Sequence, residues 1–329
     1  MICELEYKIF TTEDTEFEGL ALAVFQTQYK HNPLYKQYTD LLSVNPSSVT
    51  SINKIPFFPI EFFKTHRVAT TNFSEEAIFE SSGTTQTTPS RHFIKDLSIY
   101  QRSFETTFQN VYGPVSDWCI LGLLPAYLER ANSSLIFMVN QLITQSRNEH
   151  SGFYLYEYEK LFEVLRQLNK TGQKTLLIGV TFALLDFATD FPQPLKNTIV
   201  IETGGMKGRR KEVTRDEVHG ILKNAFEIPA IHSEYGMTEL LSQAYSEGEG
   251  IFRCPKWMKI VLREEDDPGV IKSTGRGLIN VIDLANIYSC SFIATDDIGI
   301  LHTDASFEVL GRRDNSDLRG CSVMADANS

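Results

Sequence analysis

The sequence predicts an α/β fold in which a mostly parallel sheet is flanked by helices and followed by a smaller β-rich part. Two observations carry this prediction. In the first 250 residues, short apolar runs alternate with helical patterns, which is typical of strand–helix–strand units. After residue 250, short apolar segments are separated by polar turns. We therefore expect an α/β core over residues 1–250 and a β-rich subdomain over residues 251–329.

The expected elements follow one another along the chain. An amphipathic pattern from Glu18 predicts a helix that ends at Asn32-Pro33 or soon after, and a short strand over 77–80 precedes a helix over 97–108. Buried strands are expected at 118–124, 174–180, 198–201 and 228–232. Helices are expected at 131–146, 158–170, 181–189 and 214–226, the last with a capping box of Thr214 and Glu217. Later strands are expected at 257–262, 277–283 and 291–295, with a hairpin over 300–310.

Composition and charge exclude several classes of protein. The chain has 329 residues, of which 42% are hydrophobic, so it can bury a sizeable core. Its net charge of −11 argues against nucleic acid or an anionic membrane as the main partner. Apolar runs fall short of the ~20 residues that span a bilayer, and the N-terminus lacks the basic region of a signal peptide. We therefore expect a cytoplasmic protein without a membrane span.

The five cysteines are scattered through the chain at Cys3, Cys119, Cys254, Cys290 and Cys321. Their spacing matches neither a zinc site nor a disulfide framework, which favours free thiols in the cytosol. Apolar neighbours indicate that Cys119 and Cys290 are core residues, and Cys254 is interpreted in the same way.

Residues 55–64 contain four phenylalanines and two prolines. The prolines exclude a regular helix, and the aromatic side chains need apolar surroundings. Two interpretations remain open: an irregular segment fixed to the core, or the lining of an acyl or aryl pocket.

Residues 81–91, SSGTTQTTPSR, form a loop rich in serine and threonine. Small residues let the backbone approach an anion, and hydroxyl groups can follow a triphosphate, so the loop is a candidate phosphate-binding site. The alternative is a plain surface loop. It lacks the GKS or GKT of a Walker turn, which argues against a kinase or P-loop ATPase. Gly204 and Gly205 follow an expected strand, where ligands bind in open α/β sheets, although they could also form a simple turn.

Four segments recur in a fixed order: SSGTTQTTPSR (81–91), EYGMTE (234–239), TDDIG (295–299) and GRRDNSDLRG (311–320). Over roughly residues 75–321 this ordered set resembles the adenylate-forming superfamily of acyl- and aryl-CoA ligases. The closing Arg-Gly-Cys, the phenylalanine-rich segment and the overall size are most similar to the acyl-protein synthetases of bacterial luminescence systems. Phenylacetate-CoA ligases are more distant.

The resemblance implies a site for ATP and Mg²⁺. The residues that would hold the β- and γ-phosphates are Ser82, Gly83, Thr84 and Thr85, and Arg91 would supply a basic contact in place of the usual lysine. Tyr235 would lie against adenine, Thr238 would bind the α-phosphate, and Glu239 would hold magnesium, which prefers oxygen ligands.

The remaining motifs would complete the nucleotide site. Asp297 and Arg312 would contact the ribose, although Asp296 stands where relatives have glycine, so the acidic position could be shifted by one. Gly204 and Gly205 would line the adenine pocket, and Asp314 matches the hinge. The usual C-terminal lid, with its catalytic lysine, has no counterpart in the sequence, so another chain is expected to cover the site in a homo- or hetero-oligomer.

These roles imply that the carboxylate of an acid, expected to be a fatty acid, attacks the α-phosphorus of ATP to give an acyl adenylate, and that a thiol then accepts the acyl group. Cys321 matches the acyl-accepting cysteine of the acyl-protein synthetases, and Arg319 beside it would lower the pKa of its thiol. A reductase, a carrier protein or CoA would be the final acceptor.

Two alternative functions stay open, and so does the role of His232. The chain could pass the acyl group directly to CoA or a carrier protein without a covalent cysteine intermediate, or it could be a non-catalytic scaffold that binds nucleotide or acyl groups. His232 precedes EYGMTE and could orient the carboxylate or shield the adenylate, but a histidine at a strand end is also a common structural residue.

Overall fold

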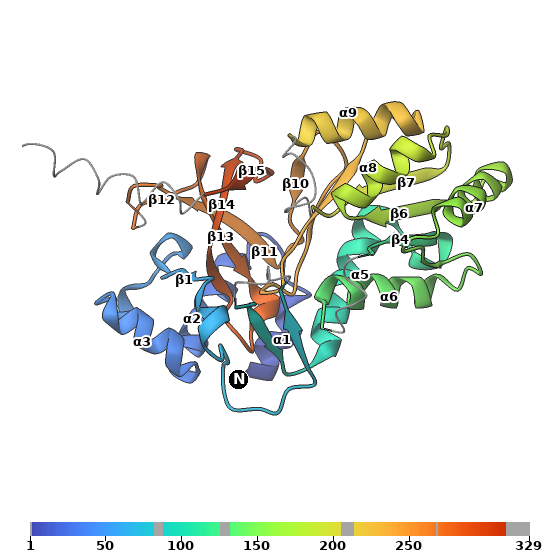
Figure 1. Ribbon diagram of the computed structural model, residues 1–329. Coiled ribbons are helices and arrows are strands. Elements are labelled where there is room, and N and C mark those ends of the chain that lie inside the picture. Colours follow the sequence, from blue (N-terminus) through green and yellow to red (C-terminus); the bar gives the residue numbers. More distant parts are fainter. Residues whose placement is uncertain (1, 82–87, 126–131, 205–213, 268, 314–329) are drawn as a thin grey trace, which may run out of the picture.

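The computed structural model describes residues 2–81, 88–125, 132–204, 214–267 and 269–313 (Figure 1). The strands in these ranges are β1 (Phe58–Pro59), β2 (Ala77–Glu80), β3 (Arg91–Ile94), β4 (Cys119–Leu123), β5 (Gly152–Phe153), β6 (Thr175–Gly179), β7 (Thr198–Glu202), β8 (His232–Tyr235), β9 (Ala244–Ser246), β10 (Ile251–Arg253), β11 (Met258–Arg263), β12 (Ile271–Lys272), β13 (Gly275–Asp283), β14 (Phe292–Leu301) and β15 (Phe307–Arg312). The α-helices are α1 (Ile2–Ile9), α2 (Phe17–His31), α3 (Pro33–Leu41), α4 (Phe62–Thr65), α5 (Leu97–Tyr112), α6 (Ser134–Ser146), α7 (Tyr158–Thr171), α8 (Thr181–Asp190) and α9 (Arg215–Phe226).

The parallel part of the sheet is confirmed. Strands β5, β4, β6, β7 and β8 lie side by side and all pair in parallel. Every residue of β4 and of β6 is buried, because helices cover both faces of this part of the sheet. In Figure 1, α8 and α9 lie on one face, and α5 and α6 lie on the other. The capping box of Thr214 and Glu217 also forms, at the start of α9.

One expected strand lies further along the chain than predicted. We expected residues 228–232, but β8 is His232–Tyr235. Pro229 has no N–H to donate to a neighbouring strand, so pairing with β7 begins only after it, at Ile201 with His232. The strand therefore carries the first two residues of the EYGMTE segment, Glu234 and Tyr235.

The rest of the sheet is mainly antiparallel, as expected. Strands β11, β13, β14 and β15 pair in that order, and β14 and β15 form the predicted hairpin. Strands β9 and β10 join this part to β8. The described strands from β4 to β15 therefore form one continuous sheet in the spatial order β12-β11-β13-β14-β15-β10-β9-β8-β7-β6-β4-β5. The expected domain boundary near residue 250 falls inside this sheet, between β9 and β10.

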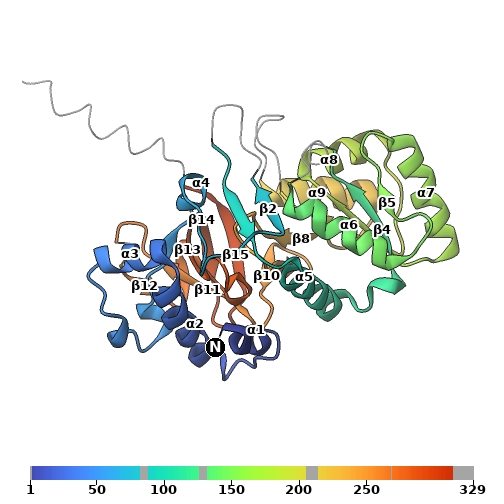
Figure 2. The ribbon, with the colours of Figure 1, turned by 90° about the horizontal axis from the view of Figure 1, so that it is seen from below.

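The N-terminal helices pack on the antiparallel part (Figure 2). Buried Gln28 on α2 donates hydrogen bonds to the carbonyls of Asn286 (3.0 Å) and Ile287 (3.1 Å). Helix α2 ends where predicted, because the Asn32 side chain accepts a hydrogen bond from Tyr35 N and Pro33 starts α3. No helix in the described ranges is long and apolar enough to cross a membrane.

The phenylalanine-rich segment is fixed to this core. Phe58 and Pro59 form β1, which pairs in parallel with β14 at Ile293 and Ala294. Phe57, Phe58 and Phe63 are buried. The interpretation of a segment fixed to the core is therefore confirmed for these three side chains, although the segment forms β1 and the start of α4 and is not irregular throughout.

The segment that carries the serine- and threonine-rich loop differs from the prediction. We expected a strand, the loop and then a helix, but a second strand, β3, pairs antiparallel with β2 before α5 begins. The loop therefore connects a hairpin. Residues 82–87 lie outside the described ranges.

Candidate active site

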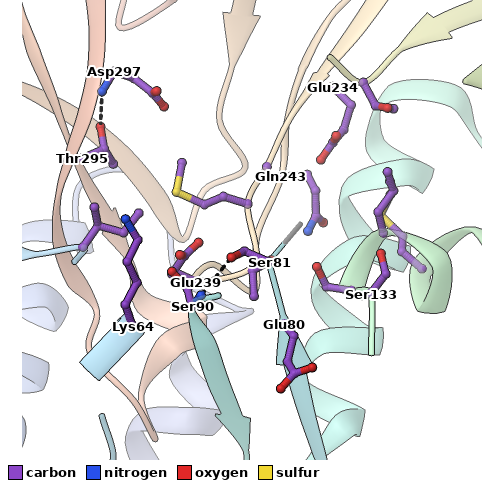
Figure 3. A pocket seen from close by; sticks show the side chains of 18 of the residues that line it. Lys64, Glu80, Ser81, Ser90, Ser133, Glu234, Glu239, Gln243, Thr295 and Asp297 are labelled. Carbon is purple, nitrogen blue, oxygen red and sulfur yellow. Dashed lines mark hydrogen bonds between the residues drawn. The ribbon is translucent and has the colours of Figure 1, made fainter. Parts of the chain in front are cut away.

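A cavity of about 300 Å³ lies where the carboxyl ends of β7 and β8 meet the β2–β3 hairpin and β14 (Figure 3). Its walls come from segments that are far apart in the sequence. The lining includes Ile60, Lys64, Glu80, Ser81, Thr88, Ser90, Tyr100, Ser133, Ser134, Leu135, Met138, Thr203, Glu234, Gly236, Met237, Thr238, Glu239, Gln243, Thr295, Asp296, Asp297 and Arg312. The volume is within the range of ligand sites.

An acid and a guanidinium form one end of the cavity. Asp297 and Arg312 are direct partners in the β14–β15 register, and Arg312 Nε donates to Asp297 Oδ1 over 2.9 Å. The hydroxyl of Tyr235 donates to Asp297 Oδ2, also over 2.9 Å. Asp297 is only 5% exposed, so these two donors hold its carboxyl group in a buried position.

Glu239 supplies a second carboxylate. Its side chain is 6% exposed, and burial raises its pKa against the opposing effects of a hydrogen bond from Ser90 and the charges of Arg312 and Lys64. The described residues contain no cluster of three or more side chains of the types His, Cys, Asp and Glu that could hold a metal alone. A single carboxylate still fits Mg²⁺, which is usually bound through one or two carboxylates together with substrate phosphates and water.

The turn that carries Thr238 and Glu239 is held by two buried side chains. His92 Nδ1 donates to the carbonyl of Thr238 over 2.9 Å, and Asn286 Nδ2 donates to the carbonyl of Glu239 over 2.7 Å. Burial lowers the pKa of His92 to about 4, so the ring is neutral and its Nε2 accepts from the Ser289 hydroxyl.

Asp283 fixes the residues that follow this turn. Its carboxylate accepts hydrogen bonds from the backbone N–H groups of Leu241, Ser242 and Ala285 and from the Ser242 hydroxyl. Burial raises its pKa to about 6, and these hydrogen bonds oppose that effect. The rigidity of the turn therefore depends on contacts between segments more than 40 residues apart.

The opposite wall of the cavity is polar as well. Burial, and secondly the charge of Glu202, raises the pKa of Glu234 to about 8, so this carboxyl is largely protonated at neutral pH. Gln243 is 3% exposed, and its Oε1 has no hydrogen-bond partner in the described part of the chain. Figure 3 shows both side chains at this wall.

Comparison with protein families identifies the family of this chain. The model of the family "Acyl-protein synthetase, LuxE" matches residues 10–328 of the chain. The chain belongs to the LuxE acyl-protein synthetase family. The predicted enzyme class, an adenylate-forming ligase of the acyl-protein synthetase kind, is thereby confirmed.

Two curated proteins are similar over most of their length. A long-chain-fatty-acid–luciferin-component ligase of Vibrio harveyi is 25% identical over 92% of this chain and 85% of its own. The ligase of the same name from Aliivibrio fischeri is 22% identical over 97% of this chain and 93% of its own.

Solved structures share the fold. A 2-hydroxyisobutyryl-CoA ligase in complex with 2-HIB-AMP and CoA has a TM-score of 0.64 at 11% identity, over 94% of this chain and 77% of its own. ATP-bound MatB from Rhodopseudomonas palustris has a TM-score of 0.55 at 15% identity, over 73% of this chain and 49% of its own. At these identities the likeness shows the fold alone.

The synthetase fold brings four of the predicted site residues to the cavity wall. These are Thr238, Glu239, Asp297 and Arg312. The uncertain neighbour Asp296 also lines the cavity, but only Asp297 pairs with Arg312.

Two further candidates, Tyr235 and Gly204, lie beside the cavity lining. The ring of Tyr235 packs against Phe252 and Phe307, and only its hydroxyl reaches Asp297. Gly204 donates its N–H to Glu202 and adopts a positive φ of 76° next to the lining residue Thr203.

Arg91 and His232 do not line the cavity. Arg91 is exposed at the start of β3, with its guanidinium over the ring of Phe93. His232 lies two residues before Glu234 on β8, and its Nδ1 meets the hydroxyl of Tyr112 at 3.2 Å. Its position gives no support to a role in orienting the substrate.

Several predicted residues lie outside the described ranges. They are Ser82, Gly83, Thr84, Thr85, Gly205, Asp314 and Cys321. Ser81 and Thr88, which flank the predicted phosphate loop on its two sides, both line the cavity.

The sequence analysis missed Lys64, His92, Glu234 and Asp283. Lys64 ends the phenylalanine-rich segment, and a lone cation after an apolar run was the only available signal. Glu234 is the first letter of EYGMTE, but its high pKa depends on burial and on Glu202 from another strand.

Proposed function

We propose that the chain activates a carboxylic acid with ATP to give an acyl adenylate and then transfers the acyl group to a thiol. One observation carries the proposal: Glu239, Thr238 and the Asp297–Arg312 pair line the same cavity although they come from three separate segments. Hydroxyl groups of Ser81, Thr88 and Ser90 line it too. The set provides the acids, cations and hydroxyls that a nucleotide needs.

Each group has a role that suits its surroundings. The Asp297 carboxylate accepts hydrogen bonds from the ribose hydroxyls, and Arg312 and Tyr235 hold it in place. Thr238 donates its hydroxyl to the α-phosphate. Glu239 holds Mg²⁺, which when bound neutralises phosphate charge. A distant structural neighbour, MatB from Rhodopseudomonas palustris, binds ATP, which supports this use of ATP.

The first half-reaction is a nucleotidyl transfer. A carboxylate oxygen forms a bond to the α-phosphorus, the bond from that phosphorus to the bridging oxygen of the β-phosphate breaks, and pyrophosphate leaves with the electron pair. No proton is transferred. The chain therefore contributes position and charge neutralisation rather than a general base. The acid is proposed to be a fatty acid, as the names of the curated relatives suggest.

In the second half-reaction a thiolate attacks the acyl carbonyl, the bond to the AMP oxygen breaks, and AMP leaves. We propose Cys321 as this thiol and a reductase or carrier protein as the next acceptor. Burial raises the pKa of Cys119 to about 11 and that of Cys290 to about 12, so both stay protonated and unreactive. Burial raises the pKa of Cys254 as well, so this thiol also stays protonated.

The test is ATP–pyrophosphate exchange with a panel of fatty and aryl acids in the presence of Mg²⁺. Exchange that depends on one class of acid is expected. If none of the acids supports exchange although ATP binds tightly, the result would instead favour a non-catalytic scaffold.

A second experiment tests the cysteine. Radiolabelled acid and ATP should label the denatured wild-type chain, and Cys321→Ser should lose the label while keeping exchange. Persistent labelling of the serine variant, or no labelling of the wild type despite exchange, would favour direct transfer to CoA or a carrier protein.

A further inference from the structure

Lys64 stands on a short helix that is fixed to both sides of the proposed site. Just before α4, the N–H of Ile60 donates to the carbonyl of Ala294 on β14 over 3.0 Å, three residues before Asp297. Within α4, buried Phe63 packs edge-on against His92, with ring centroids 5.6 Å apart. His92 in turn holds the carbonyl of Thr238. The position of Lys64 is therefore set relative to the acid pair and to the Thr238 turn.

The ionisable side chains around the cavity are mostly acidic. Its described acidic side chains are Glu80, Glu234, Glu239, Asp296 and Asp297, whereas its described cations are Lys64 and Arg312. Arg312 is committed to Asp297 at 2.9 Å. The Lys64 ammonium group forms no ion pair or hydrogen bond with another described residue. Such a lining repels ATP and a carboxylate unless cations offset the charge.

The Lys64 ammonium group points into the cavity. Figure 3 shows its side chain extending along the wall beside Glu239 and toward Thr295. Its charge lowers the pKa of Glu239 and that of Glu61, in both cases against the stronger effect of burial. In the proposed function the α-phosphate would lie between Glu239, the magnesium ligand, and Asp297, the ribose contact on β14. An amino group near both Glu239 and β14 would therefore lie beside the α-phosphate.

We propose that Lys64 is a catalytic residue that lies between the carboxylate of the acid and the α-phosphate of ATP. This inference rests on the proposed function. As the carboxylate oxygen bonds to the α-phosphorus and pyrophosphate departs with the electron pair of the broken bond, two anions must approach each other. Lys64 stays protonated throughout and offsets their repulsion by donating hydrogen bonds to both. The phenylalanine-rich segment then serves to aim this cation.

The test compares three variants of the full chain in ATP–pyrophosphate exchange, with an acid that the wild type accepts. Lys64→Met removes the charge, and Lys64→Arg keeps it. Lys54→Met is the matched control, because Lys54 is an exposed lysine just before this segment and does not line the cavity. Lys64→Met should lower kcat by about 10²–10³-fold, the usual effect of removing one transition-state donor. Its KM for ATP should change less than about threefold, since the contact strengthens in the transition state.

The controls separate a chemical role from a structural one. Lys64→Arg should retain more activity than Lys64→Met, and Lys54→Met should match the wild type. All three should keep the wild-type melting temperature, because both lysines are exposed. Unchanged kcat in Lys64→Met would overturn the assignment, and so would a loss confined to KM. Absence of exchange in the wild type with every acid would instead refute the proposed function.

Discussion

Glu234 should make the folded chain less stable at alkaline pH. Burial, with a smaller effect of Glu202, raises its pKa from an ordinary 4.5 to about 8. The folded state therefore binds this proton more tightly than the unfolded state, so its contribution to stability is complete below pH 4.5 and is lost as pH rises through about 8. The two values differ by about 3.5, which at about 1.4 kcal/mol per pKa unit gives a ceiling near 5 kcal/mol. Because Glu234 is partly exposed, we expect about 1–2 kcal/mol after solvent screening.

Glu234→Gln removes this ionisation while keeping the shape of the side chain. Urea unfolding at pH 5 and pH 9 measures the effect. The free energy of unfolding of the variant, relative to the wild type, should rise by about 1–2 kcal/mol between these two pH values. Glu159→Gln on α7 is the control, since Glu159 is exposed, and its difference from the wild type should not depend on pH. A difference for Glu234→Gln that is equal at both pH values would refute the reasoning.

Three further substitutions test the site. Glu239→Gln should lower exchange at least about 10²-fold, because an amide is a poorer Mg²⁺ ligand; wild-type exchange in the variant would exclude Glu239 as the metal ligand. Asp297→Asn should raise the KM for ATP about tenfold through the loss of a charged hydrogen-bond acceptor, and an unchanged KM in steady-state kinetics would argue against ribose binding there. Asp283→Ala should lower the free energy of unfolding in urea by about 2–4 kcal/mol, because three N–H groups and one hydroxyl lose their acceptor, and a loss under about 0.5 kcal/mol would show that the turn is held by other contacts.

The parallel sheet could be predicted because its strands are buried on both faces. Residues Thr175–Gly179 of β6 are all buried, and such a run has no polar alternation to confuse with a surface strand. Local rules also predicted the start of α9, where the capping box satisfies backbone donors within four residues. The order of the four motifs predicted that Glu239, Asp297 and Arg312 meet.

The missed features depend on contacts between distant segments. The hydrogen bond from His92 to Thr238 joins residues 146 positions apart, and no local pattern encodes it. Strand β3 was overlooked because Arg91 was assigned to the phosphate loop, whereas it starts the return strand of a hairpin. The role of Lys64 depends on the pairing of β1 with β14, which brings residue 58 beside residue 293.

The central claim is that a carboxylate attacks the α-phosphorus of ATP in this cavity. The most direct measurement follows oxygen from an acid labelled with ¹⁸O in its carboxyl group, with hydroxylamine added as acyl acceptor and the nucleotide products analysed by mass spectrometry. Attack at the α-phosphorus predicts AMP that carries one ¹⁸O atom, together with unlabelled pyrophosphate. Formation of ADP with ¹⁸O in inorganic phosphate would place the attack at the γ-phosphorus and contradict the account.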